Sequence, residues 1–185
     1  ALGRFALLDP SYMIDVVLPN MVEKTLDRTD LLIRHGCALA TASLIKALAL
    51  LKAAPGTQDT QDTQNTQDLP PPLGDELLKN IRNLIPRLEK ARLYRGRGGE
   101  VMRGAACRII EAIALAGHPL SRRAQLRLLD TIDECVKHPT VIISEAAADA
   151  LSALTRQYFP SGNAAEVTEN FARMPLKYST ILRTD

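Results

Sequence analysis

Residues 92–117 read RLYRGRGGEVMRGAACRIIEAIALAG, a basic turn broken by glycines that leads directly into an apolar helix. The helical part carries Ala, Ile, Met and Cys on most of its sides, whereas a helix on a protein surface normally keeps one polar face. Such a helix needs other elements to cover nearly all of it. Helical patterns of similar length occupy most of the remaining chain, so we expect them to pack around this one.

The composition favours an all-α protein. Of the 185 residues only 4% are aromatic and none is Trp, while 46% are hydrophobic, with Ala and Leu abundant. Ala and Leu are strong helix formers, whereas β-sheets prefer aromatic and β-branched residues. A chain of this length can bury a sizeable core.

Capping residues, prolines and glycines divide the chain into predicted helices. Pro19 and Pro86 fall inside two of them and are expected to kink them, because proline removes a hydrogen bond and clashes with the preceding turn. The predicted helices cover about residues 10–26, 30–53, 75–91, 99–116, 119–137, 140–159 and 166–173. Candidate core positions in the first two are Met13, Val17, Met21, Val22, Leu32, Cys37, Leu44, Ile45 and Leu48.

Residues 54–74 differ in character from the rest. Residues 57–68 repeat Thr-Gln-Asp with one Asn, and three prolines follow at 70–72. A tract without large apolar groups does not offset its ordering entropy, so we predict a disordered low-complexity insertion. It separates helical repeats in residues 1–53 from those in residues 75–185. A partner-binding role for the tract is the alternative to a tolerated surface insertion.

An internal repeat points to the architecture. VVLPNMVEKTL (16–26) resembles NLIPRLEKARL (83–93), and each precedes a helix with an Arg in its first turns, at Arg34 and Arg103. These arginines are 69 residues apart, or about 48 without the insertion, and periods near 40–47 with two helices each are typical of HEAT-like repeats. We therefore predict an α-solenoid of HEAT-like helical hairpins in a right-handed superhelical stack, with the first helix and the last repeat truncated.

The charge is small overall but unevenly distributed. The formal net charge is +2, yet residues 75–123 hold 11 Lys or Arg against 5 Asp or Glu, a local charge of +6. This indicates a modest positive patch. The three cysteines are odd in number and widely spaced, which favours free thiols in a reducing compartment. We find no run of 18 apolar residues and no signal peptide, so no membrane partner is expected.

The glycine-rich turn lacks the features of a nucleotide site. Neither G-x-x-x-x-G-K-[ST] after a strand nor G-x-G-x-x-G in a strand–turn–helix unit is present. His35, His118 and His138 have no Cys or carboxylate at metal-ligand spacing, and no catalytic triad can be assembled from the pattern. We therefore predict no cofactor, no metal, no catalytic residue and no enzyme activity for this segment.

The sequence allows several interpretations of what the turn does. Its glycines are suited to positive φ in an inter-helix turn, and its arginines around Tyr94 resemble a weak nucleic-acid patch. Tyr and Arg are also favoured anchors in protein interfaces. The partner-binding candidates are Arg92, Tyr94, Arg95, Arg97, Glu100, Arg103, Arg34 and His35. For Arg34 and Arg103 the competing interpretation is an ion pair or hydrogen bond within a repeat.

Two strings carry a resemblance to a known family. DLLIRHGCALATASLIKAL (30–48) and LYRGRGGEVMRGAACRIIEAIAL (93–115) resemble tubulin-folding cofactor D, also called tubulin-specific chaperone D. The similarity extends more weakly to residues 1–5 and 143–154, and the Thr-Gln-Asp tract departs from it. Residues that match the family strings are Arg34, His35, Gly36, Leu93, Tyr94, Arg95, Gly96, Gly98, Gly99, Glu100, Met102 and Arg103.

The resemblance implies a function. Members of this family are cytosolic, cytoskeleton-associated HEAT-repeat proteins that hold β-tubulin. With the tubulin-folding cofactors C and E and a small Arf-like GTPase, they assemble or dismantle the αβ-tubulin dimer and act as GTPase activators. The alternatives are a generic HEAT scaffold, such as a transport or chromosome adaptor, and a nucleic-acid-binding helical repeat. Neither nucleic acid nor a membrane is expected as a partner.

Overall fold

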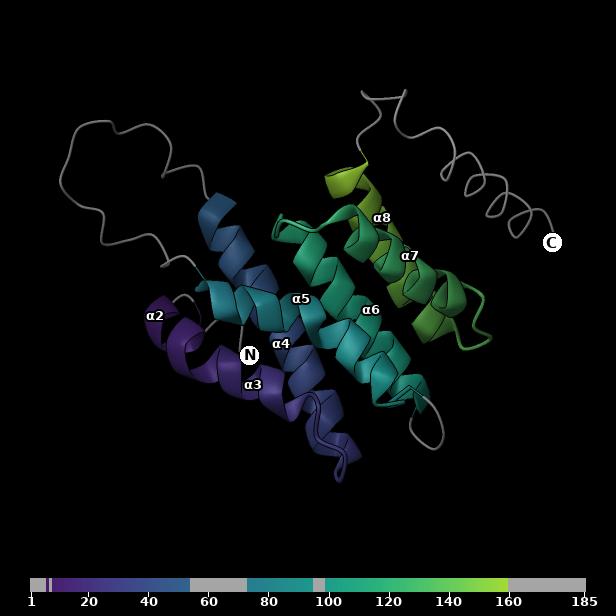
Figure 1. The fold of residues 1–185 in the computed structure, drawn as a ribbon, viewed down its shortest axis with the longest axis horizontal. Coiled ribbons are helices and arrows are strands. Elements are labelled where there is room, and N and C mark those ends of the chain that lie inside the picture. The colour runs from purple at the N-terminus through teal and green to yellow at the C-terminus, as the bar shows by residue number, and fades with distance from the viewer. Residues whose placement is uncertain (1–5, 7, 54–72, 95–98, 160–185) are drawn as a thin grey trace.

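The computed structural model describes residue 6 and residues 8–53, 73–94 and 99–159 (Figure 1). Every regular element within these ranges is helical, so the predicted all-α class is confirmed. The Thr-Gln-Asp tract and the predicted helix at residues 166–173 lie outside the described residues. The elements are α2 (Pro10–Tyr12), η1 (Met13–Val17), α3 (Leu18–Lys24), α4 (Leu31–Ala53), α5 (Asp75–Lys90), α6 (Gly99–Leu115), α7 (Arg122–Val136) and α8 (Val141–Tyr158).

The first helical segment adapts to its internal proline through a π-helix. Asp9 caps the start, since its carboxylate accepts the N–H of Tyr12 at 2.9 Å. The five residues of η1 then precede Pro19, and the N–H of Leu18 bonds to the carbonyl of Met13, five residues back. A wider turn at this place relieves the clash that a proline ring makes with an α-helical carbonyl. The predicted distortion at the proline is therefore a π-bulge.

The core positions of the first two helices differ from the prediction. In the first, the buried side chains are Ile14, Leu18 and Val22, which are four residues apart, and of the predicted face only Val22 is buried. In α4 the predicted Leu32 is wrong, because it is 81% exposed. The other four predictions for α4 are confirmed as buried: Cys37, Leu44, Ile45 and Leu48. Pro86 lies inside α5, which continues through it.

The helices form two layers (Figure 1). α4, α6 and α8 lie side by side in that order, and the contacts of α6 with its two neighbours are the most extensive in the described structure. α3 packs on α4, α5 packs on α6, and α7 packs on both α6 and α8. Each pair of successive helices, α3–α4, α5–α6 and α7–α8, thus contributes one helix to each layer.

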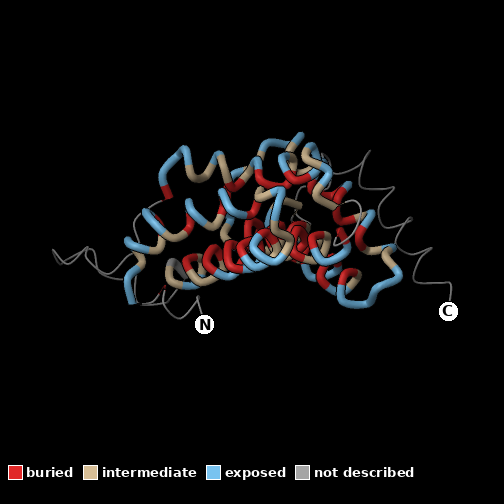
Figure 2. The backbone as a smooth tube through the Cα atoms, turned by 90° about the horizontal axis from the view of Figure 1, so that it is seen from below, coloured by how far each residue is buried: buried red, intermediate tan, exposed pale blue. Residues whose placement is uncertain are grey.

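Buried residues gather between the layers (Figure 2), and α6 contributes more of them to the core than any other helix. Met102, Ile109, Ile110 and Ile113 have no exposed surface, which confirms the expectation that other helices cover this apolar helix. Removing the apolar surface of each large side chain from water contributes roughly 2 kcal/mol to the stability of the fold. Leu73, predicted to lie in the insertion, is also buried in this core.

α4 has the length and composition of a membrane-spanning helix, although the sequence analysis predicted no membrane segment. Residues Leu31–Leu51 are long and apolar enough to cross a membrane, with a mean hydropathy of 1.3. Half of this stretch is buried inside the protein. The finding is weak evidence for a membrane helix, since the core helix of a soluble protein has the same composition.

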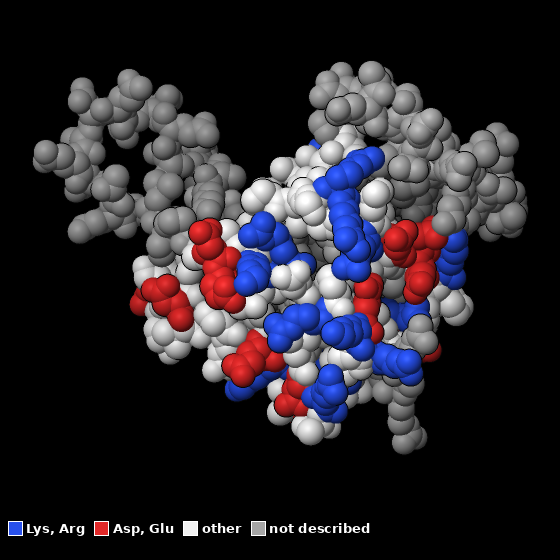
Figure 3. All heavy atoms as spheres, in the orientation of Figure 1, with Lys and Arg blue, Asp and Glu red and all other residues white. Residues whose placement is uncertain are grey.

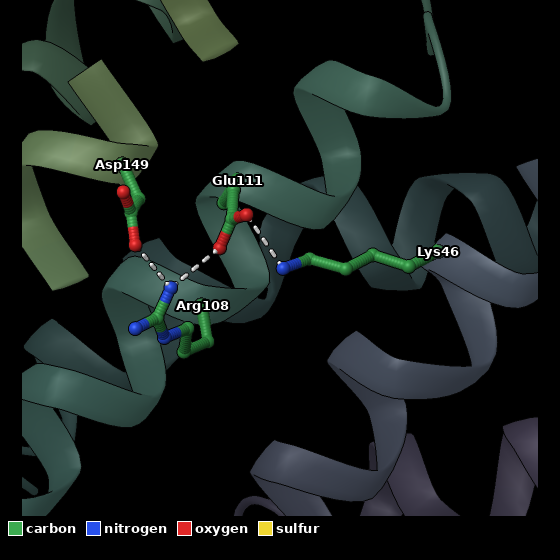
Figure 4. A network of polar contacts seen from close by, with 4 residues as sticks. All are labelled: Lys46, Arg108, Glu111 and Asp149. Atoms are coloured by element: carbon green, nitrogen blue, oxygen red, sulfur yellow. Dashed lines mark hydrogen bonds and ion pairs between the residues drawn. The ribbon is translucent and has the colours of Figure 1, made fainter. Parts of the chain in front are cut away.

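A polar network connects the three helices of one layer (Figure 4). Glu111 of α6 is central: one carboxylate oxygen lies 2.6 Å from the Lys46 ammonium of α4 and the other lies 3.1 Å from the Arg108 guanidinium. Arg108 also contacts Asp149 of α8 at 2.7 Å. Because ion pairs of this kind are satisfied only when the helices lie in one register, the network helps to fix the register of the layer.

Candidate functional site

A cleft of about 840 Å³ lies where the end of α5, the start of α6 and one face of α7 meet. It includes four of the predicted partner-binding residues, Arg92, Tyr94, Glu100 and Arg103. The other lining residues come from the last turn of α5, from α7 and from the residues that follow it: Glu89, Arg127, Asp130, Thr131, Glu134, Cys135 and His138. We call this the turn cleft.

Arg92 has an unusual backbone conformation. Its φ is +57°, the left-handed region that L-residues other than Asn and Asp seldom adopt. The N–H of Arg92 bonds to the carbonyl of Glu89 and the N–H of Leu93 bonds to that of Leu88, at 2.9 and 3.1 Å. These two bonds form a Schellman motif at the end of α5, whose left-handed position is usually occupied by glycine.

The end of α6 has the same motif as the end of α5, with a different residue at the left-handed position. There the left-handed residue is Gly117, with a φ of +65°, and the N–H groups of Gly117 and His118 make the corresponding bonds to Ala114 and Ile113. The same motif therefore has a glycine at one helix end and an arginine at the other. A residue other than glycine at this position carries a cost in stability, and here that residue lines the turn cleft.

Replacement of Arg92 by glycine is expected to raise the free energy of unfolding by about 0.5–1 kcal/mol, because glycine adopts positive φ without steric cost. Urea unfolding followed by circular dichroism measures the change. The matched variant is Gly117→Ala, for which we expect a loss of about 1 kcal/mol or more, since it places a side chain at positive φ. A destabilised Arg92→Gly protein would contradict the assignment of strain to this position.

Tyr94 lines the turn cleft and packs against the core. Its hydroxyl is buried and makes no hydrogen bond to the described residues. Burial raises the pKa of Tyr94 well above its ordinary value, with smaller contributions from Glu89 and two cysteines. The phenol therefore stays neutral, and its unsatisfied hydroxyl is a polar group that a bound partner or a neighbouring segment would satisfy.

Gly99 allows the turn to lie against the first residue of α6. A Cβ on Gly99 would overlap the carbonyl oxygen of Tyr94 and lie 2.5 Å from its carbonyl carbon. The sequence interpretation assigned the glycines of this turn to positive φ. At Gly99 the reason is instead close backbone approach, and the positive φ belongs to Arg92. Gly96 and Gly98 lie outside the described residues.

The wall formed by α7 is polar and is linked to α5. Thr131 donates a hydrogen bond of 2.6 Å to the Glu89 carboxylate and so links α7 to α5. Cys135 borders the turn cleft and is hydrogen-bonded to Cys107 of α6. That hydrogen bond, together with burial, raises the pKa of Cys107, so its thiol stays protonated at neutral pH. All three cysteines are free and buried, as the sequence predicted free thiols.

The turn cleft carries mixed charge. Arg92, Arg103 and Arg127 line it together with the carboxylates Glu89, Glu100, Asp130 and Glu134. The arginines of the turn cleft are thus accompanied by four carboxylates, of which two come from α7, one from α5 and one from α6. Arg95 and Arg97 lie outside the described residues, so their contribution stays a prediction.

Arg34 and His35 do not line the turn cleft. The Arg34 side chain is buried, with 7% of the residue exposed, and donates a 2.7 Å hydrogen bond to the carbonyl of Asp27 in the α3–α4 turn. The carboxylate of Asp27 accepts hydrogen bonds from Thr29 and Asp30, and these bonds, that of the Thr29 hydroxyl first, lower its pKa. These contacts support the interpretation of Arg34 as a structural residue.

A second groove adjoins the turn cleft and was missed by the sequence interpretation. It has a volume of about 530 Å³, lies between the N-terminal parts of α5 and α7, and shares Arg127 with the turn cleft. Lys79, Arg82 and Arg123 also line it. Lys and Arg side chains gather on this face of the molecule (Figure 3). The only signal in the sequence was the local excess of positive charge, which does not show where the side chains meet.

The described residues contain no group of three or more His, Cys, Asp or Glu side chains suited to hold a metal ion. The turn cleft instead offers Arg and Tyr side chains around an accessible hollow, a combination typical of protein contact. No protein-family model matches the chain, and no solved structure matches it significantly.

Proposed function

We propose that this chain is a non-enzymatic scaffold segment of a tubulin chaperone similar to tubulin-folding cofactor D. In this proposal the helix pairs are HEAT-like hairpins of a right-handed solenoid that holds β-tubulin. It acts in the cytoplasm with the tubulin-folding cofactors C and E and a small Arf-like GTPase, during assembly and disassembly of the αβ-tubulin dimer. GTPase activation belongs to that assembly.

The tubulin assignment is supported by the two family strings in residues 30–48 and 93–115. The second string includes Leu93 and Tyr94 after α5 and the whole of the apolar α6 around which the layers pack. The serial pairing of α3–α4, α5–α6 and α7–α8 supports a repeat architecture, because each pair covers apolar surface of the next.

The observation that carries a binding role is Arg92. It has a strained backbone conformation and lines an open cleft together with Tyr94 and Arg103. Scaffold function requires accessible anchor side chains; Arg92 is exposed, and Arg is among the residues that most often supply binding energy at interfaces. We therefore place the client contact at the turn cleft.

Size-exclusion chromatography of the 185-residue chain with purified αβ-tubulin tests the proposal. We expect co-elution, and capture at least tenfold weaker when Arg92→Glu and Arg103→Glu are combined. The control combines Arg87→Glu with Lys90→Glu, which changes the net charge equally at exposed residues of α5 that line neither the turn cleft nor the adjoining groove. Failure of the unmodified chain to bind tubulin would refute the client, and undiminished capture by the first variant would refute the site.

A further inference from the structure

We propose that the groove between the N-terminal parts of α5 and α7 binds an acidic, extended segment of a protein partner. We call it the basic groove. Its lining residues are Asp75, Lys79, Arg82, Asn83 and Pro86 from α5, and Ser121, Arg123, Ala124, Arg127 and Leu128 from the start of α7. The inference does not depend on the identity of the client at the turn cleft.

The charge of the basic groove is its first distinguishing property. It has four cationic side chains, Lys79, Arg82, Arg123 and Arg127, against the single carboxylate of Asp75. Lys79, Arg123 and Arg127 are exposed, and among the described residues the only ion pair recorded for any of the four cations is a 3.6 Å contact between Lys79 and Glu76. Cations with little internal compensation attract an anionic ligand.

Arg82 is held in place before any ligand arrives. Its Nε donates to the carbonyl of Leu78 at 3.1 Å, and its Nη1 donates to the carbonyl of Pro119 at 3.3 Å. The second bond connects α5 to the residues just before α7, so it also keeps the two sides of the groove at a fixed separation. A guanidinium that is already ordered loses less conformational entropy when it binds a carboxylate.

The floor of the basic groove suits a peptide better than a simple anion. Pro86, Ala124 and the buried Leu128 supply apolar surface, while Asn83 and Ser121 supply neutral hydrogen-bonding groups. An extended peptide can interact with both kinds of surface, because its backbone N–H and C=O groups form hydrogen bonds and the aliphatic parts of its side chains make apolar contacts. Carboxylates on the same peptide would then pair with the arginines in bidentate fashion.

The neighbouring turn cleft argues against nucleic acid in the same place. Beyond Arg127 the turn cleft has mixed charge, with Glu89, Glu100, Asp130 and Glu134 beside Arg92 and Arg103. A phosphate backbone that followed the groove would meet these four carboxylates within a few nucleotides, and no aromatic side chain lines the basic groove for a base to stack on. A peptide whose acidic run ends in neutral or basic residues is complementary to both regions.

Fluorescence anisotropy tests the inference. The probe is a peptide of six Glu followed by three Lys, labelled with a neutral dye, and we expect the 185-residue chain to bind it with an affinity that falls as salt is raised. Combining Lys79→Glu with Arg123→Glu should weaken binding at least tenfold, since both residues are exposed and line only the basic groove. Arg87→Glu with Lys90→Glu should leave it within twofold.

Three results would overturn the inference: equal weakening by both double variants, equal binding of a peptide with Gln in place of Glu, or tighter binding of a single-stranded RNA of the same charge. Circular dichroism of each variant shows that the helices are retained. Because Lys79 and Arg123 do not line the turn cleft, failure here would leave tubulin capture through Arg92 and Arg103 unaffected. Loss of tubulin binding would likewise leave the peptide result unchanged.

Discussion

Replacement of Gly99 by alanine is expected to destabilise the protein by about 3 kcal/mol. The added methyl group would overlap the carbonyl of Tyr94, which is backbone and cannot rotate away. Either the turn after α5 or the first turn of α6 has to move, and α6 is the helix on which both layers depend. Urea unfolding at fixed pH measures the loss, and the displaced Tyr94 should also alter the turn cleft.

The control is the same substitution inside α4. Gly36 lies within the helix, and nothing approaches within 4 Å of the place its Cβ would occupy. Alanine there should stabilise the protein by up to about 1 kcal/mol, because glycine is the poorer helix former. Opposite signs for the two glycines are the expected result. A Gly99→Ala protein as stable as the unmodified chain would show that the close approach to Tyr94 does not exist in solution.

Reversal of charge at Glu111 is expected to cost a similar amount, about 3 kcal/mol. The side chain is only 14% exposed and contacts both Lys46 and Arg108 (Figure 4). Glu111→Lys would remove both pairs and place three cations together in a partly buried site, where water screens them poorly. Thermal and urea unfolding measure the effect.

Two further variants identify the cause. Glu76→Lys removes an exposed ion pair with Lys79 whose atoms are 3.6 Å apart. It should cost less than about 1 kcal/mol in total, including the loss of a favourable negative charge in the first turn of α5. Adding Lys46→Glu to Glu111→Lys restores one pair between α4 and α6 and should recover part of the loss. Equal costs for Glu76→Lys and Glu111→Lys would mean that the network contributes nothing beyond surface pairing.

Much of the fold was predictable because the relevant signals are local. Helix ends follow from capping residues, as at Asp9, whose side chain bonds to Tyr12. The burial of α6 follows from its composition, since an apolar surface on most sides of a helix has to be covered. Leu32 shows the limit of this reasoning. It belongs to an apolar run in α4, but it lies on the exposed side of that helix, and the run itself does not indicate which side faces the core.

The candidate site was less predictable. Arg92, Tyr94, Glu100 and Arg103 were identified because they are close in sequence, and the structure brings them to one cleft. Asp130 and Glu134 were missed because they come from α7, about 30–40 residues further along the chain, and Glu89 was missed although it lies only three residues before Arg92. The basic groove was missed for the same reason: Lys79 and Arg123 meet only through the packing of α5 and α7.

The sequence by itself determined the all-α class, most helix ends and the burial of α6, because hydrogen-bonded turns and apolar spacing are properties of neighbouring residues. The start of α7 is an exception, since the helix predicted from residue 119 begins at Arg122, after its N-cap Ser121. Only the tertiary structure decided which charges face one another. Arg108 and Asp149 are 41 residues apart and become an ion pair when α6 and α8 lie side by side. Electrostatic interactions depend on distance in space and not on distance along the chain, so the character of both clefts arises from helix packing.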